Sequence, residues 1–533
     1  MPQPLPRIVT GSALALTLTL AACGDSAKLP ESASHGAKPE LPPPHETLLP
    51  TVKIAPAKGW PEDAKPQPAS GFTVTAFATG LDHPRTLLAL PNGDVLVAET
   101  NAPERPEEGK GIKGFIYQRV QSWAGAGVKS PNRITLLRDA DGDGVAETRN
   151  VFLKDLYSPF GMALVGGNLY IADNDAVMTF PYRDGASQID QPGKKLADLP
   201  AGPLNHHWTK GLTASEDGSK LYASIGSNSN AGENGLDKEK GRAAIREIDI
   251  QSGAWREYAT GLRNAVALAV EPQTKTLWAV VNERDELGSD LVPDYLTSVK
   301  DGAFYGWPFS YWGQHVDDRV KPQNPELVAK AVMPDYALGN HVAPLGLVFA
   351  QDPRMPQPYQ SGAFVGEHGS WNRNPRSGYK VVFVPFANGK PSGPPQDILT
   401  GFVNKDGKAM GRPVGVAIDK TGALLVADDV GNTIWRVVAT GATPPRRSLK
   451  SGVRPSIRPN YQLVRAAVRC IGTLCHQRCW MEVPAHAIEA QATDRVQRLP
   501  KLQTRIARTT QDYGPSTTPA LFRRFFQDGS SQT

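Results

Sequence analysis

One pattern recurs six times between Gly71 and Val438: turn-forming residues are followed directly by a short β-rich run. The six copies are "PNGDVLVAET" (91–100), "GGNLYIADND" (166–175), "EDGSKLYASIGS" (216–227), "PQTKTLWAVVNE" (272–283), "YQSGAFVGEHGS" (359–370) and "KTGALLVADDVG" (420–431). Most copies follow, at roughly ten residues, a small-residue segment such as "SPFGMAL", "RNAVALAV", "APLGLVFA" or "GRPVGVAI". Short strands with a period of roughly 60 residues are typical of propeller blades, each of which covers the apolar faces of its neighbours. The repeats predict an all-β fold, a six-bladed β-propeller over residues 71–440; two stacked β-sandwich domains are the alternative architecture.

The first residues have the composition of an export signal. Arg7 precedes the apolar stretch Ile8–Leu20, which is too short to span a bilayer comfortably and runs into Leu-Ala-Ala-Cys-Gly. This pattern is typical of a bacterial lipoprotein signal peptide over residues 1–22, with lipid attached to Cys23. A plain signal peptide with an incidental cysteine is the alternative. Because lipid tethers a protein without making it span the bilayer, we expect an exported, membrane-anchored lipoprotein that faces the periplasm or the cell exterior.

Neither flank of the repeats carries a hydrophobic period. Residues 23–70 are rich in Pro, Ala, Lys and Glu, which predicts a disordered, Pro-rich linker or stalk, with folding beginning near Gly71. Residues 441–533 contain 15 Lys plus Arg against 5 Asp plus Glu, so the basic pI of the chain, about 8.8, belongs to this tail. Contact with nucleic acid or with an anionic membrane is one interpretation. We favour a disordered extension with no nucleic-acid partner, because the tail has no packed core.

The cysteines of the tail do not form a familiar metal or haem motif. Cys470, Cys475 and Cys479, together with His476, match neither C-x-x-C-H nor the paired short spacings of zinc sites. No cysteine occurs from Gly24 to Val438, so the repeats do not depend on disulfides. With 40% hydrophobic and 21% charged residues, the body of the chain is neither a disordered nor a multi-span membrane protein.

An acidic loop lies between the first two repeats. It supplies oxygen donors at positions 1, 3, 5 and 9, a carbonyl at position 7 and a glycine at position 6, where a tight turn is needed. The donors are Asp139, Asp141, Asp143, the Val145 carbonyl and Glu147. Ca²⁺ prefers six to eight oxygen ligands, so the loop predicts a structural calcium site. A surface Asp-Gly turn is the alternative.

Chemically reactive residues gather next to the repeated strands, where the loops of a propeller surround its channel. They fall in five stretches: 206–210 (HHWTK), 261–264 (GLRN), 282–285 (NERD), 366–375 (GEHGSWNRNP) and 411–413 (GRP). Three arginines and one lysine directed at one channel indicate an anionic guest, and the neighbouring tryptophans indicate a flat one. A lone arginine is also compatible with a surface or interblade ion pair.

Six strings, most of which include these stretches, resemble one family. "HHWTKGL" with "LYASIGSNSNAGENG", "GLRNA", "NERDELGSDLVPDYL", "GAFYGWP", "GEHGSWNRN" and "GRPVGVA" are similar, in the same order, to soluble quinoprotein dehydrogenases, which include glucose and L-sorbosone dehydrogenases that depend on pyrroloquinoline quinone (PQQ). The resemblance is closer to the sorbosone dehydrogenase branch. It implies a six-bladed propeller that binds PQQ and Ca²⁺ and oxidises an aldose, sorbosone or a related aldehyde by hydride transfer to the quinone. It also implies that electrons pass to an acceptor such as a quinone or cytochrome.

The resemblance assigns the reacting groups. His207 matches the general base that takes the proton from the substrate hydroxyl, and an ordinary histidine pKa of about 6.5 suits this work. Arg263 and Asn264 match the pair that contacts the reacting oxygen of the quinone, where a guanidinium stabilises developing charge. An acidic residue is expected immediately before the base in the glucose enzymes, but His206 stands there, so glucose itself is doubtful as the substrate.

The resemblance also assigns binding groups. The backbone carbonyls of Asp285 and Glu286 match the cofactor Ca²⁺ ligands, Asp290 matches a carboxylate near the substrate, and Arg412 matches a binder of the cofactor carboxylates. Trp371 would supply an aromatic plane. Two departures concern cofactor binding. A second arginine is expected two positions after Arg412, where this chain has Val414. A lysine expected in the fifth repeat has no equivalent, although Arg373 is suited to its role.

Two other function classes stay open at this point. A Ca²⁺-dependent propeller hydrolase, similar to a lactonase, would need several carboxylates or amides around a channel metal. A non-catalytic binding propeller would have little use for a histidine matched with an Arg-Asn pair.

Overall fold

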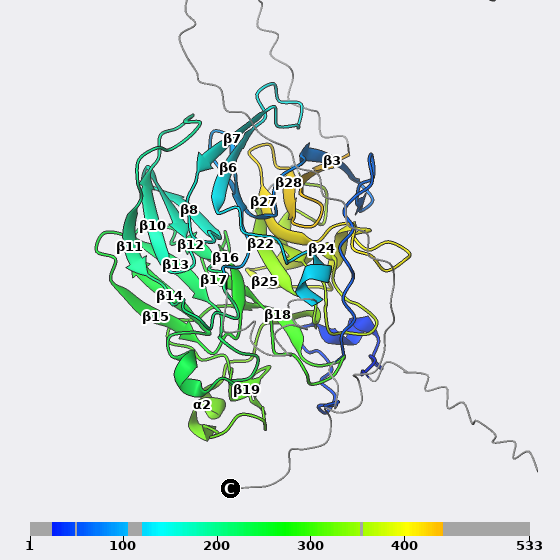
Figure 1. The fold of residues 1–533 in the computed structure, drawn as a ribbon. Coiled ribbons are helices and arrows are strands. Elements are labelled where there is room, and N and C mark those ends of the chain that lie inside the picture. The colour runs from blue at the N-terminus through cyan, green and yellow to red at the C-terminus, as the bar shows by residue number, and fades with distance from the viewer. Residues whose placement is uncertain (1–23, 48–50, 105–119, 352–354, 441–533) are drawn as a thin grey trace, which may run out of the picture. The chain divides into compact units, whose positions relative to one another are not determined.

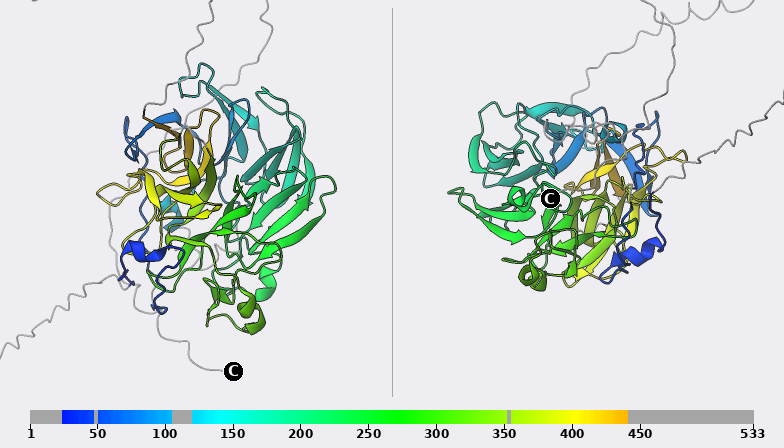
Figure 2. Two further views of the ribbon diagram at one scale, coloured as in Figure 1. Left: turned by 180° about the vertical axis from the view of Figure 1, so that it is seen from behind. Right: turned by 60° about the horizontal axis from the view of Figure 1, so that its bottom comes forward.

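The computed structural model describes residues 24–47, 51–104, 120–351 and 355–440, and these form a six-bladed β-propeller. The sheets follow one another around a ring from cyan through green to yellow (Figure 2). Each blade has four antiparallel strands, and the innermost strand of each blade begins at the same mouth of the central channel. The predicted fold is therefore confirmed. The predicted signal peptide, Cys23 and the basic tail lie outside the described residues.

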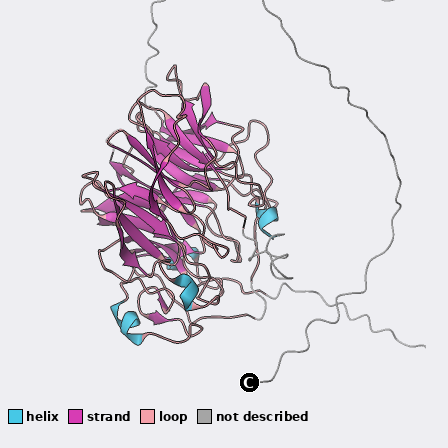
Figure 3. Ribbon diagram, turned by 60° about the vertical axis from the view of Figure 1, so that its left-hand side comes forward, coloured by secondary structure: helices cyan, strands magenta, loops and turns pink. Residues whose placement is uncertain are grey.

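Regular structure in the described residues is almost entirely strand (Figure 3). The first three blades are β4 (Pro84–Ala89), β5 (Val95–Glu99), β6 (Arg133–Arg138) and β7 (Thr148–Leu153); β8 (Gly161–Val165), β9 (Asn168–Ala172), β10 (Ala176–Pro181) and β11 (Lys194–Asp198); and β12 (Leu212–Ala214), β13 (Lys220–Ile225), β14 (Ala244–Asp249) and β15 (Trp255–Thr260). The last three are β16 (Ala265–Val270), β17 (Leu277–Val281), β18 (Pro293–Ser298) and β21 (Tyr336–Asn340); β22 (Pro344–Gln351), β23 (Ser361–Glu367), β24 (Lys380–Ala387) and β26 (Gln396–Thr400); and β27 (Pro413–Ile418), β28 (Leu424–Asp428), β29 (Thr433–Ala439) and β3 (Phe72–Ala78). Short elements outside these sets are η1 (Glu31–Ser34), η2 (Leu236–Glu239), α2 (Pro325–Lys330), β1 (His35–Gly36), β2 (Gln67–Pro68), β19 (Ser310–Tyr311), β20 (His315–Val316) and β25 (Lys390–Pro391). No helix in the described ranges is both long and apolar enough to cross a bilayer.

The repeated runs are the second strands of the blades, β5, β9, β13, β17, β23 and β28, and the small-residue segments before them include the inner strands β8, β16, β22 and β27. Local chemistry explains the hairpins. In the turn before β5, Asn92 Oδ1 accepts a hydrogen bond from the Asp94 backbone N–H at 2.9 Å, and Gly93 has a φ of 99°. Small residues are required on the inner strands because the inner strands of neighbouring blades approach one another closely. A side chain at Gly346 would place its Cβ 2.1 Å from the Val414 carbonyl oxygen of the next blade.

The core lies between the blades. Six apolar clusters each join two neighbouring sheets, and together they complete the ring. Between the fourth and fifth blades, the Trp278 ring packs edge-on against Phe349 and Phe386, with centroid distances of 6.3 and 5.1 Å. Each blade therefore depends on its neighbours for burial of its apolar faces.

The ring is closed by a strand from the beginning of the propeller. β3 pairs antiparallel with β29, and Phe72 lies opposite Ala439. The sixth sheet thus contains three strands from the end of the repeats and one from their beginning, which is the blue strand beside the yellow ones in Figure 1. Backbone hydrogen bonds hold both ends of the propeller in one blade.

The stretch before Gly71 differs from the expected stalk. In its described parts, 24–47 and 51–70, the chain packs along the propeller (Figure 1), where β1 pairs with β21 and β2 pairs with β26. Asp25 accepts a hydrogen bond from the Ser289 backbone N–H at 2.6 Å, and Ala55 is completely buried. The prediction that folding begins near Gly71 was wrong, because these residues add edge strands and backbone contacts without any hydrophobic period.

Candidate functional site

A cavity of about 440 Å³ lies at the mouth of the channel where the inner strands begin. Loops from five of the six blades and the segment before the first blade line it. The lining includes Ile54, Gln121, His206, His207, Asn230, Glu233, Arg263, Asn264, Glu283, Asp285, Glu286, Asp294, His341, His368, Trp371, Asn372 and Arg412. The structure therefore brings together seven residues that the sequence selected: His207, Arg263, Asn264, Asp285, Glu286, Trp371 and Arg412.

His207 is half-buried and precedes β12. Its Nδ1 lies 3.0 Å from the Ser227 carbonyl oxygen and 2.9 Å from Ser227 Oγ. A carbonyl oxygen only accepts hydrogen bonds, and the Ser227 hydroxyl donates to the Ser229 carbonyl, so the proton of a neutral His207 ring lies on Nδ1. The basic lone pair is then on Nε2. Gly226 permits this placement, because a Cβ there would lie 2.4 Å from the His207 Cβ.

Arg263 is buried, and the protein itself occupies all five of its N–H donors. Nε donates to the Asn230 carbonyl, and Nη1 donates to the carbonyls of Asn282 and Glu283. Nη2 donates to Asn230 Oδ1 at 3.0 Å and to Asp285 Oδ2 at 3.2 Å. Arg263 therefore joins three loops of the cavity wall, and contact with a quinone oxygen would require it to give up one of these bonds.

Asn264 presents a different case. Its Oδ1 is buried and has no hydrogen-bond partner among the described residues, although the side chain lines the cavity. This amide oxygen lies only 2.5 Å from the position of a Cβ at Gly226, so it is held close to His207. Asn264 is thus placed to receive a donor from a bound molecule.

The Asp285 carbonyl does not fit the predicted calcium ligand. It already accepts hydrogen bonds from Arg284 Nε at 3.2 Å, Arg284 Nη2 at 3.0 Å and Asn230 Nδ2 at 3.1 Å. A guanidinium beside this oxygen disfavours a divalent cation. The Glu286 side chain is exposed and pairs with Arg319 at 2.9 Å. The predicted backbone pair is therefore at the cavity, but the surroundings of Asp285 are wrong for Ca²⁺.

Arg412 has the properties expected of an anion binder. It is buried, its Nη2 donates to the Ala55 carbonyl at 2.9 Å, and its Nε has no hydrogen-bond partner in the described part of the chain. The guanidinium carbon lies 4.9 Å from the centre of the Tyr379 ring. Trp371 also lines the cavity and is half-buried. A partly unsatisfied guanidinium and an indole at one cavity suit a flat anion.

Arg373 and Asp290 do not line this cavity. Arg373 Nε donates to the Ser289 carbonyl at 2.9 Å, and its Nη2 lies 3.6 Å from Asp290. Asp290 Oδ2 accepts backbone hydrogen bonds from Lys28 and Leu29. Asp290 therefore holds the segment before Gly71 against the propeller, and Arg373 lies beside Asp290. The suggestion that Arg373 replaces a cofactor-binding lysine is not supported by its position.

Comparison with known proteins identifies the family. A family profile described as TrAA12-like matches residues 128–295 and 314–440, more than half of the sequence. The chain belongs to the TrAA12-like family. A PQQ-dependent pyranose dehydrogenase from Coprinopsis cinerea is 24% identical over 363 residues, which cover 60% of this chain but only 44% of that protein. An uncharacterized protein from Borreliella burgdorferi is 26% identical over 346 residues, 60% of this chain and 88% of that one.

Solved structures share the fold of this TrAA12-like chain. The holo PQQ domain of the Coprinopsis cinerea pyranose dehydrogenase has a TM-score of 0.57 at 21% identity, covering 71% of this chain and 98% of that one. A Trichoderma reesei family AA12 structure has the same TM-score and identity, covering 74% of this chain and all of that one. The sequence resemblance therefore pointed to the correct fold, while its sorbosone dehydrogenase branch stays a prediction.

Several cavity residues of this TrAA12-like propeller had not been selected from the sequence. Burial raises the pKa of Glu283 to about 7 and the pKa of Asp294 to about 7. Burial alone would lower the pKa of His341. A hydrogen bond to Asp285 and the negative charge of that carboxylate outweigh burial and raise the pKa of His341 above its ordinary value. Glu283 lies within the quoted string "NERDELGSDLVPDYL", whereas His341 has no sequence signal, because only the fold brings it beside Asp285.

Some residues of the stretch 366–375 line the cavity, and others are buried in the protein interior. His368, Trp371 and Asn372 line the cavity, and His368 Nε2 lies 2.9 Å from Asp429 Oδ2. Glu367 is buried elsewhere, and neither of its carboxylate oxygens has a partner within the described ranges. Burial raises the pKa of Glu367 well above its ordinary value. Its side chain does not line the cavity, so Glu367 is not placed to act as the base of this site.

The acidic loop lies apart from the cavity, between β6 and β7. One oxygen from each of Asp139, Asp141, Asp143 and Glu147 lies within 4.8 Å of the others. The loop is already curved for this arrangement, since Asp139 accepts backbone hydrogen bonds from Gly142 and Gly144. A structural Ca²⁺ at this loop stays our proposal, with the Val145 carbonyl as the further donor.

Proposed function

We propose that this chain is a PQQ-dependent oxidoreductase that oxidises an aldose, sorbosone or a related aldehyde. One observation carries the proposal: the buried Arg412, which lines the same cavity as His207, has a guanidinium Nε without a hydrogen-bond partner among the described residues. PQQ is planar and carries three carboxylates, so it needs a cation at its edge and a flat side chain nearby. Arg412 and Trp371 fit these needs. Family membership and the names of the Coprinopsis cinerea relatives support the same cofactor.

The chemistry of the proposal divides between cofactor and protein. When bound, PQQ would supply the acceptor for a hydride. His207 takes the proton of the substrate hydroxyl on Nε2, because its Nδ1 is held by Ser227. Asn264 Oδ1, which has no partner in the described ranges, orients a donor of the bound substrate or cofactor. Loss of the hydroxyl proton to His207 as the hydride leaves converts the alcohol or hydrate carbon to a carbonyl.

The proposal includes a structural Ca²⁺ at the acidic loop but no Ca²⁺ ligand at Asp285. The residues at Asp285 do not fit a Ca²⁺ ligand, because its carbonyl already accepts three hydrogen bonds, two of them from Arg284. The proposed reaction at this cavity therefore uses no metal ligand at Asp285. Membrane attachment through Cys23 and transfer of electrons to a quinone or cytochrome complete the proposal, on the basis of the signal sequence and the family resemblance.

A propeller hydrolase is the second candidate, and one observation favours it. The amide oxygens of Asn264 and Asn372 both line the cavity and both lack a partner among the described residues. Amide oxygens are suitable Ca²⁺ ligands. Hydrolysis of a lactone panel in the presence of Ca²⁺, without any dye reduction in the presence of PQQ, would favour this candidate over the oxidoreductase.

The proposed function is tested by loading the full chain with PQQ and following reduction of an artificial dye with a panel of aldoses and aldehydes. His207→Ala should lower kcat on the order of a hundredfold or more while PQQ affinity stays near that of the parent. Arg412→Ala should weaken PQQ binding, with a smaller loss of turnover at saturating PQQ. His315→Ala, at an exposed histidine in β20, is the control. Equal loss of PQQ affinity in the first two variants, or parent turnover in His207→Ala, would contradict the assigned roles.

A further inference from the structure

Residues 51–58, which we call the strap, pass the mouth of the cavity before the propeller begins. The Ile54 side chain lines the cavity, whereas Val52, two residues earlier, is 49% exposed. Lys53 lines a second cavity of about 400 Å³ together with Tyr379 and Arg376. Lys53 and Ile54 are successive residues, and successive residues of an extended chain point to opposite sides, which explains why these two side chains line different cavities.

The strap is hydrogen-bonded to two walls of the site. The Lys53 backbone N–H donates to the Trp371 carbonyl at 2.8 Å, and the Ala57 backbone N–H donates to the Trp123 carbonyl at 2.8 Å. Trp371 is a cavity residue, and Trp123 lies in the segment that contributes Gln121 and Ala124 to the lining. The strap therefore connects the loop after β23 with the loop before β6.

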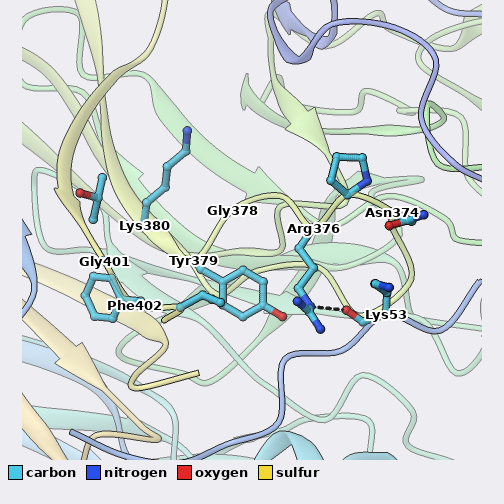
Figure 4. Close-up of a pocket in the computed structure, with 11 residues that line it drawn as sticks. Lys53, Asn374, Arg376, Gly378, Tyr379, Lys380, Gly401 and Phe402 are labelled. Atoms are coloured by element: carbon cyan, nitrogen blue, oxygen red, sulfur yellow. Dashed lines mark hydrogen bonds between the residues drawn. The ribbon is translucent and has the colours of Figure 1, made fainter. Parts of the chain in front are cut away.

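The strap also fixes Arg412. Ala55 is completely buried, its carbonyl accepts the Arg412 Nη2 hydrogen bond at 2.9 Å, and its N–H donates to Tyr379 Oη at 3.3 Å. From the other side, Arg376 Nε donates to the Lys53 carbonyl at 2.6 Å, as Figure 4 shows, and Arg376 Nη2 donates to the Ile54 carbonyl at 2.9 Å. The backbone on both sides of the Ile54 side chain is therefore anchored, which limits how far that side chain can move.

We infer that Ile54 is a specificity-determining residue: the strap closes one side of the cavity, and the Ile54 side chain limits the size of the sugar that can reach His207. This inference rests on the proposed function, but the wall itself can be tested without turnover. An anchored aliphatic side chain excludes bulk by steric contact, and such contacts typically change kcat/KM about tenfold or more between substrates of different size.

The first experiment tests the wall. Ile54→Cys and Val52→Cys are prepared in the full chain, and labelling is read by peptide mass, since residues 24–440 contain no native cysteine. A small methanethiosulfonate should react at both positions. A bulky maleimide should react about tenfold more slowly at position 54 than at position 52, because the cavity restricts it. Equal maleimide rates at the two positions would overturn the inference, whether or not the protein oxidises sugars.

The second experiment tests specificity. Ile54→Ala should shift the ratio of kcat/KM for a disaccharide over a monosaccharide about tenfold toward the disaccharide, mainly through KM, and Ile54→Trp should shift it the other way. Val52→Ala and Val52→Trp are the matched controls and should keep the parent ratio. An unchanged ratio in the Ile54 variants of an active enzyme contradicts the inference. If the parent oxidises no sugar, the proposed function fails, and the labelling experiment alone decides whether the wall exists.

Discussion

The carboxyl groups of Glu283 and Asp294 belong to residues that line the cavity, which we propose binds an anion. The Glu283 backbone N–H donates to Asp294 Oδ1 at 2.7 Å, and Glu283 Oε1 has no partner in the described part of the chain. Burial raises the pKa of each carboxyl group to about 7. Near neutral pH these two groups therefore hold protons that ordinary carboxyl groups would have lost, which limits the negative charge facing a bound anion.

This proton uptake predicts a pH dependence of stability. Between the ordinary pKa of a glutamate and about 7, the folded protein binds more protons than the unfolded chain, so the free energy of unfolding should fall as the pH rises through this window. Glu283→Gln cannot ionise, so its free energy of unfolding should fall less steeply from pH 5 to pH 8. Urea unfolding at intervals across this range measures the slope. Glu286→Gln, at an exposed position on the same rim, is the control, and equal slopes in the parent and Glu283→Gln would contradict the prediction.

At the scale of elements, the repeated pattern in the sequence predicted the second strand of each blade. Turn chemistry followed by β-rich runs located β5, β9, β13, β17, β23 and β28, because these strands are buried on both faces and begin at tight turns. It could not locate β1 and β2, which are two residues long and are held by backbone hydrogen bonds rather than by an apolar face. The same limit applies to the candidate site: Arg373 was predicted to bind the cofactor, but Ser289 and Asp290, distant in sequence, determine the direction of its side chain.

The acidic loop between β6 and β7 gives a prediction at this scale. Four carboxylates that converge within 4.8 Å repel one another when no cation is bound, so calcium that binds only the folded state should raise the melting temperature with its concentration. A double variant, Asp141→Ala with Asp143→Ala, should lose this dependence. Thermal unfolding with calcium and with a chelator measures it. A double variant whose melting temperature follows calcium as the parent's does would show that the ion binds elsewhere or not at all.

For the whole molecule, the propeller is closed before the basic tail begins. β29 ends at Ala439 and pairs with β3, so every described blade is complete at that residue. A chain ending at Thr440 should therefore keep the melting temperature of the parent and its activity toward whichever substrate the dye assay identifies. Circular dichroism on heating and the dye assay test this expectation. Loss of soluble expression on truncation would show that residues 441–533 belong to the folded domain.

We propose that a lipid on Cys23, one residue before the described chain, attaches the molecule to a membrane. Cys23→Ser should move the protein from the membrane fraction to the soluble exported fraction, because the acyl chains would be absent while the rest of the export signal remains. Cell fractionation with an antibody against the propeller measures the change. An unchanged membrane fraction would indicate another anchor, such as the basic tail. Since Asp25 binds Ser289, the lipid proposed on Cys23 would hold the propeller near the bilayer and not at the end of a stalk.

The pairing of β3 with β29 also limits when the molecule can finish folding. A ribosome makes β3 early, but its partner strand is available only after residue 439 has been made, so the sixth blade cannot form during most of translation. Until then an edge of β3 has no partner and the ring has a gap. A ring that closes this late leaves the chain incompletely folded for most of its synthesis, and that delay would suit the export that we propose for this protein, because an exported chain is threaded through a secretion channel before it folds.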